Sequence, residues 1–416
     1  MAATEANYNP PPVVDSYQRT ALIVGVVGLL LAVALAFLTG GPARFFRSYL
    51  VGFVFWCGIA IGSLAIMMLH HLSGGGWGLV VRRIFEAATR TVPLLAILFI
   101  PIAVSLFVHP VGEGGHSQSL YEWSDHHVVE NDPILQAKAK YYLNIPFFLG
   151  RAVFYFLVWG GLAFLLSRFS RRQDETGDPR LKDWMQNVSG PGILLFGLTV
   201  TFASFDWMMS LEPHWFSTIY GFLIMAGWAL TAFAFVILVA SILQRHEPFT
   251  HVYLPAHFHD YGKLLLAFVM VYAYFSFSQF LIIWSANLPE EIPWYLRRLR
   301  GGWQYVGLAV VLFHFALPFV LLLSRTLKRN SRLLSRVALM VLVARMIDMV
   351  YLVSPAFVHE GQDPHFQPLD LLAMVGMTIG VGGIWLAYFI RELKGRPLLP
   401  INAPGLDEAL AATGHH

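Results

Sequence analysis

The sequence predicts an all-α polytopic membrane protein with about ten transmembrane helices, on three observations. Of the 416 residues, 56% are hydrophobic and only 13% are charged, whereas soluble domains carry roughly 25% charged residues. Apolar runs of about 20 residues, the length that a helix needs to cross a bilayer, recur along the whole chain. The runs are continuous rather than alternating, which excludes a transmembrane β-barrel.

The apolar runs define the expected spans, and an even number of spans places both chain ends on one side of the membrane. They lie near residues 21–38, 49–70, 91–108, 146–167, 191–212, 216–243, 261–286, 303–324, 337–355 and 369–390. Residues 1–20 contain Glu5, Asp15 and a proline run. This differs from the basic start of a signal peptide, so the first run is expected to remain as a helix. The predicted parts are a tail 1–20, a transmembrane domain 21–391 and a tail 392–416.

The distribution of lysine and arginine among the loops predicts the orientation. The loops on the side of the termini are the more basic, chiefly around 82–90, 168–182 and 325–336. Because basic loops remain in the cytoplasm, both termini are expected to be cytoplasmic, in a bacterial inner membrane. The longest connection, residues 109–144, then faces the periplasm, and a loop of this length is either functional or a cap over its own helices.

The cysteine and histidine content predicts that this chain binds no metal itself. The single Cys57 lies inside an apolar run, so it has no disulfide partner and cannot form a four-thiolate iron–sulfur cluster. No C-x-x-C-H motif is present for covalent haem attachment. The near-balanced net charge of +3 gives no indication of a nucleic-acid partner.

Ionisable residues inside the spans are the first candidates for function, because each costs at least about 2.5–3.5 kcal/mol at bilayer depth. In LTVTFASFDWMMSLEPHW, the residues Thr199, Asp206 and Ser210 recur at i, i+7 and i+11 and share one helix face. Glu212 and His214 continue this line outward. The alternative is that Asp206 only ties two helices together by hydrogen bonds.

The span near 261–286 carries a second polar stripe. Tyr272, Ser276 and Gln279 share one face, and hydrogen-bonding groups facing lipid would be unsatisfied. We therefore expect them to face the bundle interior, a hydrated path or a polar ligand. Lys263 lies on the opposite face near the cytoplasmic end, where it could extend to water and have no function.

Further polar residues lie at i, i+3 and i, i+4 spacings in other spans. Arg345 and Asp348 can form an ion pair within one helix, which is often only structural. Arg151 and Tyr155 share a face at the outer end of the fourth span. His314 stands alone near the middle of its span and is expected to be a structural histidine.

Three long motifs resemble one family. They are MMLHHLSGGGWGLVVRRIFEAATRTVPLL (67–95), FDWMMSLEPHWFSTIYG (205–221) and HDYGKLLLAFVMVYAYFSFSQFLIIWSANLPEEIPWY (259–295). Together they resemble the membrane subunits of alternative complex III, which belong to the NrfD/PsrC-like family of quinone-interacting integral membrane proteins. The length and the run YGKLL…SQFLIIW are most similar to the ActF-type subunit.

The resemblance implies an architecture and a set of partners. It implies two four-helix bundles side by side plus peripheral helices, next to a paralogous NrfD-like quinone-binding subunit, an iron–sulfur subunit and cytochrome c subunits. Haem c and iron–sulfur clusters would then be in the partners. In this family the quinol site lies near the periplasmic surface and is usually assigned to the other paralogue. The candidates for contacting quinone in this chain are His70, His71, Arg151 and Tyr155.

Quinol oxidation releases two electrons and two protons, and the protons need carboxylates, histidines or hydroxyls within hydrogen-bond reach. The expected proton path contains, on the outer side, Asp206, Ser210, Glu212 and His214, and from the cytoplasm Lys263, Tyr272, Ser276, Gln279, Arg345 and Asp348. The sequence leaves open whether the two stretches meet. The chain is not expected to be catalytic alone.

Two other functional classes remain open. A secondary transporter would use the intramembrane charges to bind substrate, but the paired Gly/Pro-interrupted spans typical of that class are missing from the sequence. A purely structural anchor would use the polar stripes only to hold helices together.

Overall fold

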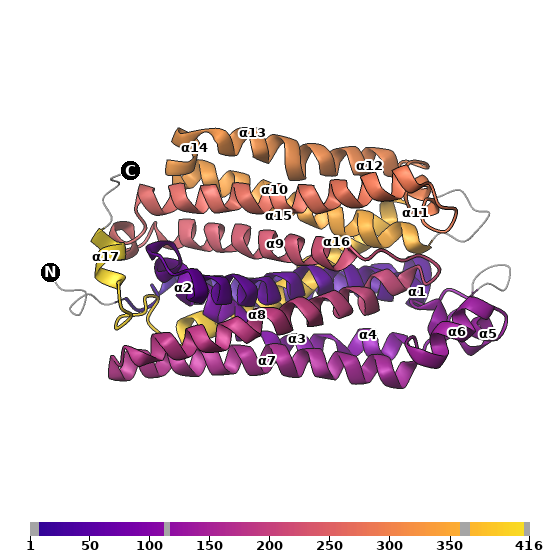
Figure 1. The fold of residues 1–416 in the computed structure, drawn as a ribbon, viewed down its shortest axis with the longest axis horizontal. Helices are drawn as coiled ribbons and strands as arrows, with labels where there is room; N and C mark the ends of the chain where they lie inside the picture. The colour runs from indigo at the N-terminus through magenta and orange to yellow at the C-terminus, as the bar shows by residue number, and fades with distance from the viewer. Residues whose placement is uncertain (1–7, 112–116, 358–366, 412–416) are drawn as a thin grey trace.

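The computed structural model describes residues 8–111, 117–357 and 367–411, and this part of the chain is almost entirely helical. The elements are α1 (Val13–Ser73), α2 (Gly76–Thr89), α3 (Val92–Leu98), α4 (Ile100–Ser105), η1 (Glu122–Ser124), α5 (His126–Glu130), α6 (Pro133–Tyr141), α7 (Ile145–Thr176), α8 (Arg180–Trp207), η2 (Met209–Leu211), α9 (Tyr220–Leu243), η3 (Phe249–His251), α10 (Pro255–Ala286), α11 (Pro293–Arg298), α12 (Trp303–Val310), η4 (Val311–Ala316), α13 (Leu317–Leu323), α14 (Arg325–Arg329), α15 (Ser331–Val353), η5 (Ser354–Phe357), α16 (Pro368–Lys394) and α17 (Leu406–Ala411). The long helices run side by side along the longest axis (Figure 1). In the described residues, nine helical stretches are long and apolar enough to cross a membrane, as an all-α polytopic protein requires.

The first of these stretches accounts for two of the expected spans. A straight helix as long as α1 would extend about 90 Å, three times the thickness of a bilayer core. The helix bends at Gly41, whose φ of 64° and ψ of −157° are left-handed and non-helical, and Pro42 follows. Both halves of α1 contact α16, at neighbouring positions along that helix. A Cβ at Gly25 would lie 2.6 Å from the carbonyl carbon of Gly383, and the Trp56 indole donates to the Thr378 carbonyl at 2.7 Å.

Helix ends differ from the expected spans because polar residues continue the helices beyond the apolar runs. The helix α1 begins at Val13, within the expected tail 1–20. The third expected span, 91–108, is preceded by the helix α2, and the whole stretch runs from Gly76 to Ser105. The helix α16 continues to Lys394, and the C-terminal tail holds α17. That helix is fixed in place: His257 Nε2 lies 2.9 Å from the Ala409 carbonyl oxygen.

The long helices form two groups of four neighbours. The second half of α1 packs with α2–α4, α7 and α8, while α9 packs with α10 and α15, and α12–α13 packs against α10 and α15. Contact between α1 and α9 joins the groups, and α16 packs chiefly on α1. In Figure 1 the first group occupies the lower half of the molecule and the second the upper half.

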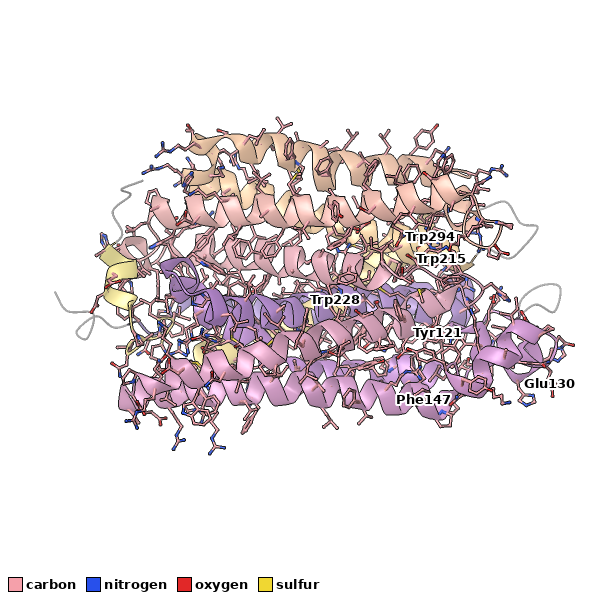
Figure 2. All side chains as sticks on the ribbon, in the orientation of Figure 1. Tyr121, Glu130, Phe147, Trp215, Trp228 and Trp294 are labelled. Atoms are coloured by element: carbon pink, nitrogen blue, oxygen red, sulfur yellow. The ribbon has the colours of Figure 1, made fainter. Side chains whose placement is uncertain are left out.

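The two ends of the molecule differ. The first and last described segments meet at one end, where the Leu398 N–H donates to the Tyr8 carbonyl at 2.8 Å and Lys394 pairs with Asp15 at 2.5 Å. The opposite end carries α5, α6 and α11 (Figure 2). There the described part of 109–144 packs on the end of α8, since the Tyr121 hydroxyl donates to the Trp207 carbonyl at 3.1 Å.

Candidate functional site

The first polar cluster joins α7 to α8 around a fully buried carboxylate. Asp206 accepts two hydrogen bonds from Arg151, at 2.9 Å from Nε and 2.7 Å from Nη2. It also accepts one from the Tyr155 hydroxyl at 2.7 Å. We call these three residues the Asp206 cluster. A bidentate arginine is the strongest partner that a carboxylate can have in a protein, so the cluster fixes both helices at this level.

Residues around the Asp206 cluster hold its side chains in place. The Arg151 guanidinium stacks on the Tyr142 ring at 3.8 Å and donates to the Tyr142 carbonyl at 3.0 Å. The Ser210 hydroxyl donates to the Asp206 carbonyl at 2.5 Å. Deeper in the bundle, the Trp159 indole donates to the Thr199 hydroxyl at 2.9 Å. Thr199 and Asp206 therefore share a buried face of α8, as their spacing predicts. Ser210 is also buried, but it lies beyond the end of that helix, on η2, so the predicted single helix face does not extend to it.

The second cluster lies in the other group of helices and has the same composition. Asp348 of α15 accepts hydrogen bonds from Tyr272 of α10 and from Arg345, through the same carboxylate oxygen. All three side chains are almost completely buried, and the Arg345 guanidinium lies 5.0 Å from the centre of the Tyr272 ring. We call these residues the Asp348 cluster. Arg345 and Asp348 form the ion pair that their i, i+3 spacing predicts.

His314 belongs to this cluster, although the sequence predicts a solitary structural histidine. Its ring meets the Tyr272 ring edge-on, with 4.5 Å between the centres. It lies on η4, a single turn of π-helix, a feature often found at functional sites. His314 Nε2 and Arg345 Nη2 are buried without a hydrogen-bond partner in the described part of the chain. On α9, a Cβ at Gly227 would overlap the Arg345 guanidinium, so only glycine leaves room for it.

A third cluster lies between η2 and α11, at the end of the molecule opposite the termini (Figure 1). Glu212 is 8% exposed and pairs with Arg298 at 3.1 Å and with Arg297 at 3.2 Å. The fully buried Arg298 also donates to the Leu352 carbonyl at 2.9 Å and stacks on Trp294 at 3.5 Å. We call this the Glu212 cluster. The sequence does not predict these partners of Glu212, because the two arginines follow it by more than eighty positions.

A buried tyrosine lies in the region between the second and third clusters. Tyr220, buried at the start of α9, lies within electrostatic range of Glu212 and Arg298 on one side and of Arg345 and Asp348 on the other. The expected outer and inner stretches therefore approach one another around Tyr220.

Gln279 and its neighbours form a separate short chain of hydrogen bonds. Its amide accepts from the Ser217 hydroxyl at 3.1 Å and donates to the Tyr295 hydroxyl at 3.4 Å. Ser276 is half-buried on the same face of α10. The stripe of Tyr272, Ser276 and Gln279 thus faces other helices, as expected.

Lys263 and His214 lie at the surface rather than in these clusters. Lys263 is 57% exposed and pairs with Asp260 on its own helix at 3.2 Å. It precedes Tyr272 by about 13 Å of helix, which fits the alternative that it only reaches water. His214 is 49% exposed and its Nε2 lies 2.5 Å from Asp132 of the outer segment.

The four candidates for quinone contact do not form one pocket. His71 lies within electrostatic range of Arg82 and Glu86, and Glu86 accepts from Ser170 near the end of α7 at 2.6 Å. Arg151 lies near the start of the same helix, about 28 Å away at 1.5 Å per residue. His70 and His71 are therefore at the end of the molecule where the termini meet, and Arg151 and Tyr155 are at the other.

One buried ion cluster is not predicted from the sequence. It lies at the end where the termini meet. Glu86 is 1% exposed and pairs with Arg82 at 2.9 Å, with Arg83 at 2.6 Å and with Arg396 at 3.7 Å. Arg83 pairs in turn with Asp174 of α7. The i−4 and i−3 spacing of the arginines from Glu86 was the available signal, but the segment lies outside the apolar runs.

Among the residues that the structure describes, no three or more His, Cys, Asp or Glu side chains are grouped as metal ligands would be. A comparison with models of known protein families found no match, and no curated protein sequence matches the chain. A function must therefore be argued from the polar clusters themselves and from the resemblance of the three motifs.

Proposed function

We propose that this chain is a membrane subunit of a quinol-oxidising complex of the alternative complex III type, and that it conducts protons through its buried carboxylate clusters. The observation that supports the proposal best is the pair of equivalent clusters. Each group of four helices contains one buried aspartate with a tyrosine hydroxyl and an arginine bound to it. Two such sites in the apolar interior cost too much free energy to be incidental.

The clusters have the parts that proton transfer needs. A carboxylate that accepts a hydrogen bond from a phenol is already linked to the next donor, and transfer requires groups within such reach. The arginine compensates the carboxylate charge, so the aspartate can stay in the interior between transfers. His314, with an unpartnered Nε2 beside Tyr272, adds a group that can gain or lose a proton.

The proposal places electron transfer in partner subunits. Oxidation of one quinol to quinone gives two electrons, which the haem c and iron–sulfur partners would accept, and two protons. The residues of this chain act only on protons, in an inner membrane with both termini cytoplasmic. The quinol pocket is left to the paralogous subunit or its interface, because His70 and His71 lie far from Arg151 and Tyr155.

The proposal competes with a structural anchor and with a secondary transporter. The anchor is favoured by one observation, the complete pairing of both Asp206 oxygens. An anchor would need the hydrogen bonds of the clusters but not their ability to exchange protons. A transporter would be isolated without cytochrome c or iron–sulfur partners.

The substitutions Asp206→Asn and Asp348→Asn test the proposal in the purified complex reconstituted into vesicles. Asparagine keeps the size of the side chain and one acceptor oxygen, but it cannot carry a proton and it leaves the charge of the arginine uncompensated. We expect each variant to assemble and to slow quinol-driven proton release at least about a hundredfold, the lower end of the range for general acid–base groups. Proton release is followed with a pH-sensitive dye and assembly by copurification of the haem and iron–sulfur subunits.

The matched control is Asp183→Asn, an exposed aspartate on the same helix as Asp206, which should behave as the unchanged chain. If both cluster variants oxidise quinol and release protons at the full rate, the chain is an anchor. If the chain is isolated alone from its native membrane, the assignment to a quinol-oxidising complex fails.

A further inference from the structure

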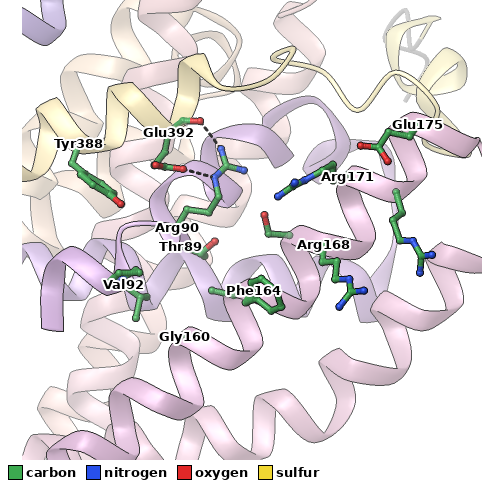
Figure 3. Close-up of a pocket in the computed structure, with 14 residues that line it drawn as sticks. Thr89, Arg90, Val92, Gly160, Phe164, Arg168, Arg171, Glu175, Tyr388 and Glu392 are labelled. Atoms are coloured by element: carbon green, nitrogen blue, oxygen red, sulfur yellow. Dashed lines mark hydrogen bonds and ion pairs between the residues drawn. The ribbon is translucent and has the colours of Figure 1, made fainter.

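A cavity of about 510 Å³ opens between α2–α3, α7 and α16, away from the clusters described above (Figure 3). It lies at the end where the termini meet, next to the ion pairs that Glu86 forms with Arg82, Arg83 and Arg396. Four arginines line it: Arg90, Arg168, Arg171 and Arg172. Part of its lining is apolar and includes Val92 and Phe164. The cavity thus combines cationic and apolar side chains within one opening.

The charges of the lining side chains are not balanced by the protein. The carboxylates in the lining are those of Glu175 and Glu392, two against four guanidinium groups. Arg90 already binds Glu392. Its Nε donates to the Glu392 carboxylate at 3.1 Å, and its Nη2 donates to the Glu392 backbone carbonyl at 2.5 Å. In the described part of the chain, none of the three arginines of α7 forms an ion pair.

Arg90, one of the four lining arginines, and the neighbouring Arg396, which also pairs with Glu86 at 3.7 Å, both contribute to the positive field at the cavity. Arg90 Nη1 is buried without a hydrogen-bond partner in the part of the chain that the structure describes. Arg396 lies beside the cavity and donates to the hydroxyl of the lining residue Ser167 at 3.0 Å. Burial, and then the positive charge of Arg90, lower the pKa of Arg396 to about 10. An anion in the cavity would accept a hydrogen bond from Arg90 Nη1 and would favour the charged form of Arg396.

The apolar part of the lining indicates what kind of anion fits. Val92, Phe164 and Gly160 belong to membrane-spanning stretches, and the Phe164 side chain is 62% exposed at the side of α7. A free phosphate ion would gain no binding free energy from these apolar side chains. A phospholipid would place acyl chains along them while its phosphate met the guanidinium groups, and basic pockets between spans on the cytoplasmic side suit such headgroups.

We infer that this cavity is a binding site for an anionic phospholipid of the cytoplasmic leaflet, with the headgroup phosphate among the four lining arginines, Arg90, Arg168, Arg171 and Arg172, and an acyl chain against Phe164. The inference does not depend on the proposed proton path. A multi-pass membrane protein of any function could use the site to seal the gap between α7 and α16.

The charge variant Arg168→Gln/Arg172→Gln tests the headgroup contact. The full chain is purified in detergent, stripped of lipid and titrated with phosphatidylglycerol, with diphosphatidylglycerol, with phosphatidylcholine and with inorganic phosphate, and binding is followed by native mass spectrometry. We expect the two anionic lipids to bind and phosphatidylcholine not to bind. At about 1 kcal/mol for each basic residue near an anionic headgroup, the variant should bind them about 30-fold more weakly.

The control pair is Arg332→Gln/Arg336→Gln, two exposed arginines with the same spacing on α15. Equal losses in both pairs would mean diffuse charge attraction and would overturn the site. Binding of phosphatidylcholine as tight as that of the anionic lipids, or inorganic phosphate binding as tightly as they do, would overturn it too.

A second variant tests the apolar part without changing charge. At Gly160 of the lining an added Cβ would meet only Val92, at 3.8 Å, so Gly160→Leu fills the cavity without displacing the protein. The matched control is Gly161→Leu, where a Cβ meets nothing within 4 Å. We expect Gly160→Leu to lose the bound lipid and Gly161→Leu to keep it. Retention in both would contradict the placement of the acyl chain.

Discussion

Asp132 shows how one side chain links α6 to the turn that follows η2. Its Oδ1 accepts from the backbone N–H groups of Ile134 at 2.8 Å and Leu135 at 3.1 Å, which caps α6. Its other oxygen lies 2.5 Å from His214 at the end of the spans. Burial opposes the charge, but the backbone N–H of Leu135 and the His214 ring outweigh it and hold the pKa of Asp132 below its ordinary value.

Replacing this cap should loosen α6. A carboxylate with a lowered folded-state pKa stabilises the protein above its unfolded pKa of about 3.9, and this stabilisation is lost as the pH falls through the folded value. At pH 7 it is fully present, so Asp132→Ala should cost about 1 kcal/mol locally. Hydrogen exchange of the α6 amides should then be about fivefold faster.

Asp132→Asn should lose less than Asp132→Ala, since asparagine caps helices as well as aspartate does. Glu130→Ala is the control, because Glu130 is 63% exposed in the same segment. Unchanged exchange in Asp132→Ala would show that the segment is held without its cap.

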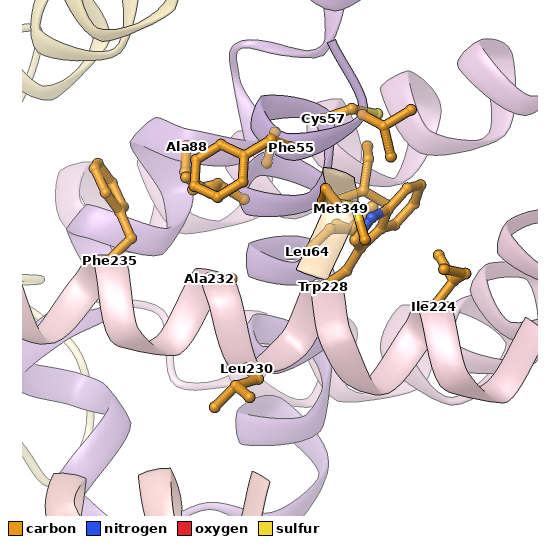
Figure 4. Packing of buried hydrophobic residues seen from close by; sticks show 14 of the residues in the cluster. Phe55, Cys57, Leu64, Ala88, Ile224, Trp228, Leu230, Ala232, Phe235 and Met349 are labelled. Atoms are coloured by element: carbon orange, nitrogen blue, oxygen red, sulfur yellow. The ribbon is translucent and has the colours of Figure 1, made fainter. Parts of the chain in front are cut away.

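At the scale of the helices, glycines set how closely α1 approaches α9. Figure 4 shows hydrophobic side chains of both helices in this region, among them Leu64 and Trp228. A Cβ at Gly58 would lie 2.5 Å from the Trp228 ring, and one at Gly62 would overlap the Trp228 carbonyl. The G-x-x-x-G spacing is typical of close helix packing in membranes. Here it brings together the two groups of helices, since α1 belongs to the first and α9 to the second.

Gly62→Ala should therefore destabilise the contact between the groups. The obstructing atom is a backbone oxygen, which cannot move aside as a side chain can, so we expect a loss of about 1–3 kcal/mol. The measurement is the thermal unfolding midpoint of the purified chain in detergent. Gly161→Ala is the control and should leave the midpoint equal or higher, because alanine favours a helix where space is open. A midpoint unchanged by Gly62→Ala would mean that α1 and α9 can separate at little cost.

The helices themselves could largely be predicted, whereas the partners of the polar residues could not. An apolar run is a local property of the sequence, so most spans start or end within a turn or two of their predicted limits. The Arg151–Asp206 and Glu212–Arg298 pairs join different helices, and one sequence contains no signal for them. Glu86 was missed for the opposite reason, because α2 is charged enough to resemble a loop.

At the scale of the whole molecule, the chain has two chemically different ends. One holds Lys394, Arg396 and the basic cavity, and the other holds the acidic segment with α5 and α6 (Figure 1). Because basic residues stay on the cytoplasmic side, this asymmetry predicts a single orientation. The spans alone would fit either direction equally well.

Single-cysteine labelling tests the orientation directly. The only native thiol, Cys57, is fully buried and should not react. His126→Cys introduces a thiol on α5, where the native side chain is 87% exposed, and Asp178→Cys introduces one between α7 and α8 at the opposite end. In intact spheroplasts of an expressing bacterium, a membrane-impermeant maleimide should label His126→Cys at once and Asp178→Cys only after permeabilisation. The unchanged chain is the control for Cys57. If only Asp178→Cys were labelled before permeabilisation, the orientation would be the reverse of the predicted one. The arginine-lined cavity would then lie in the outer leaflet.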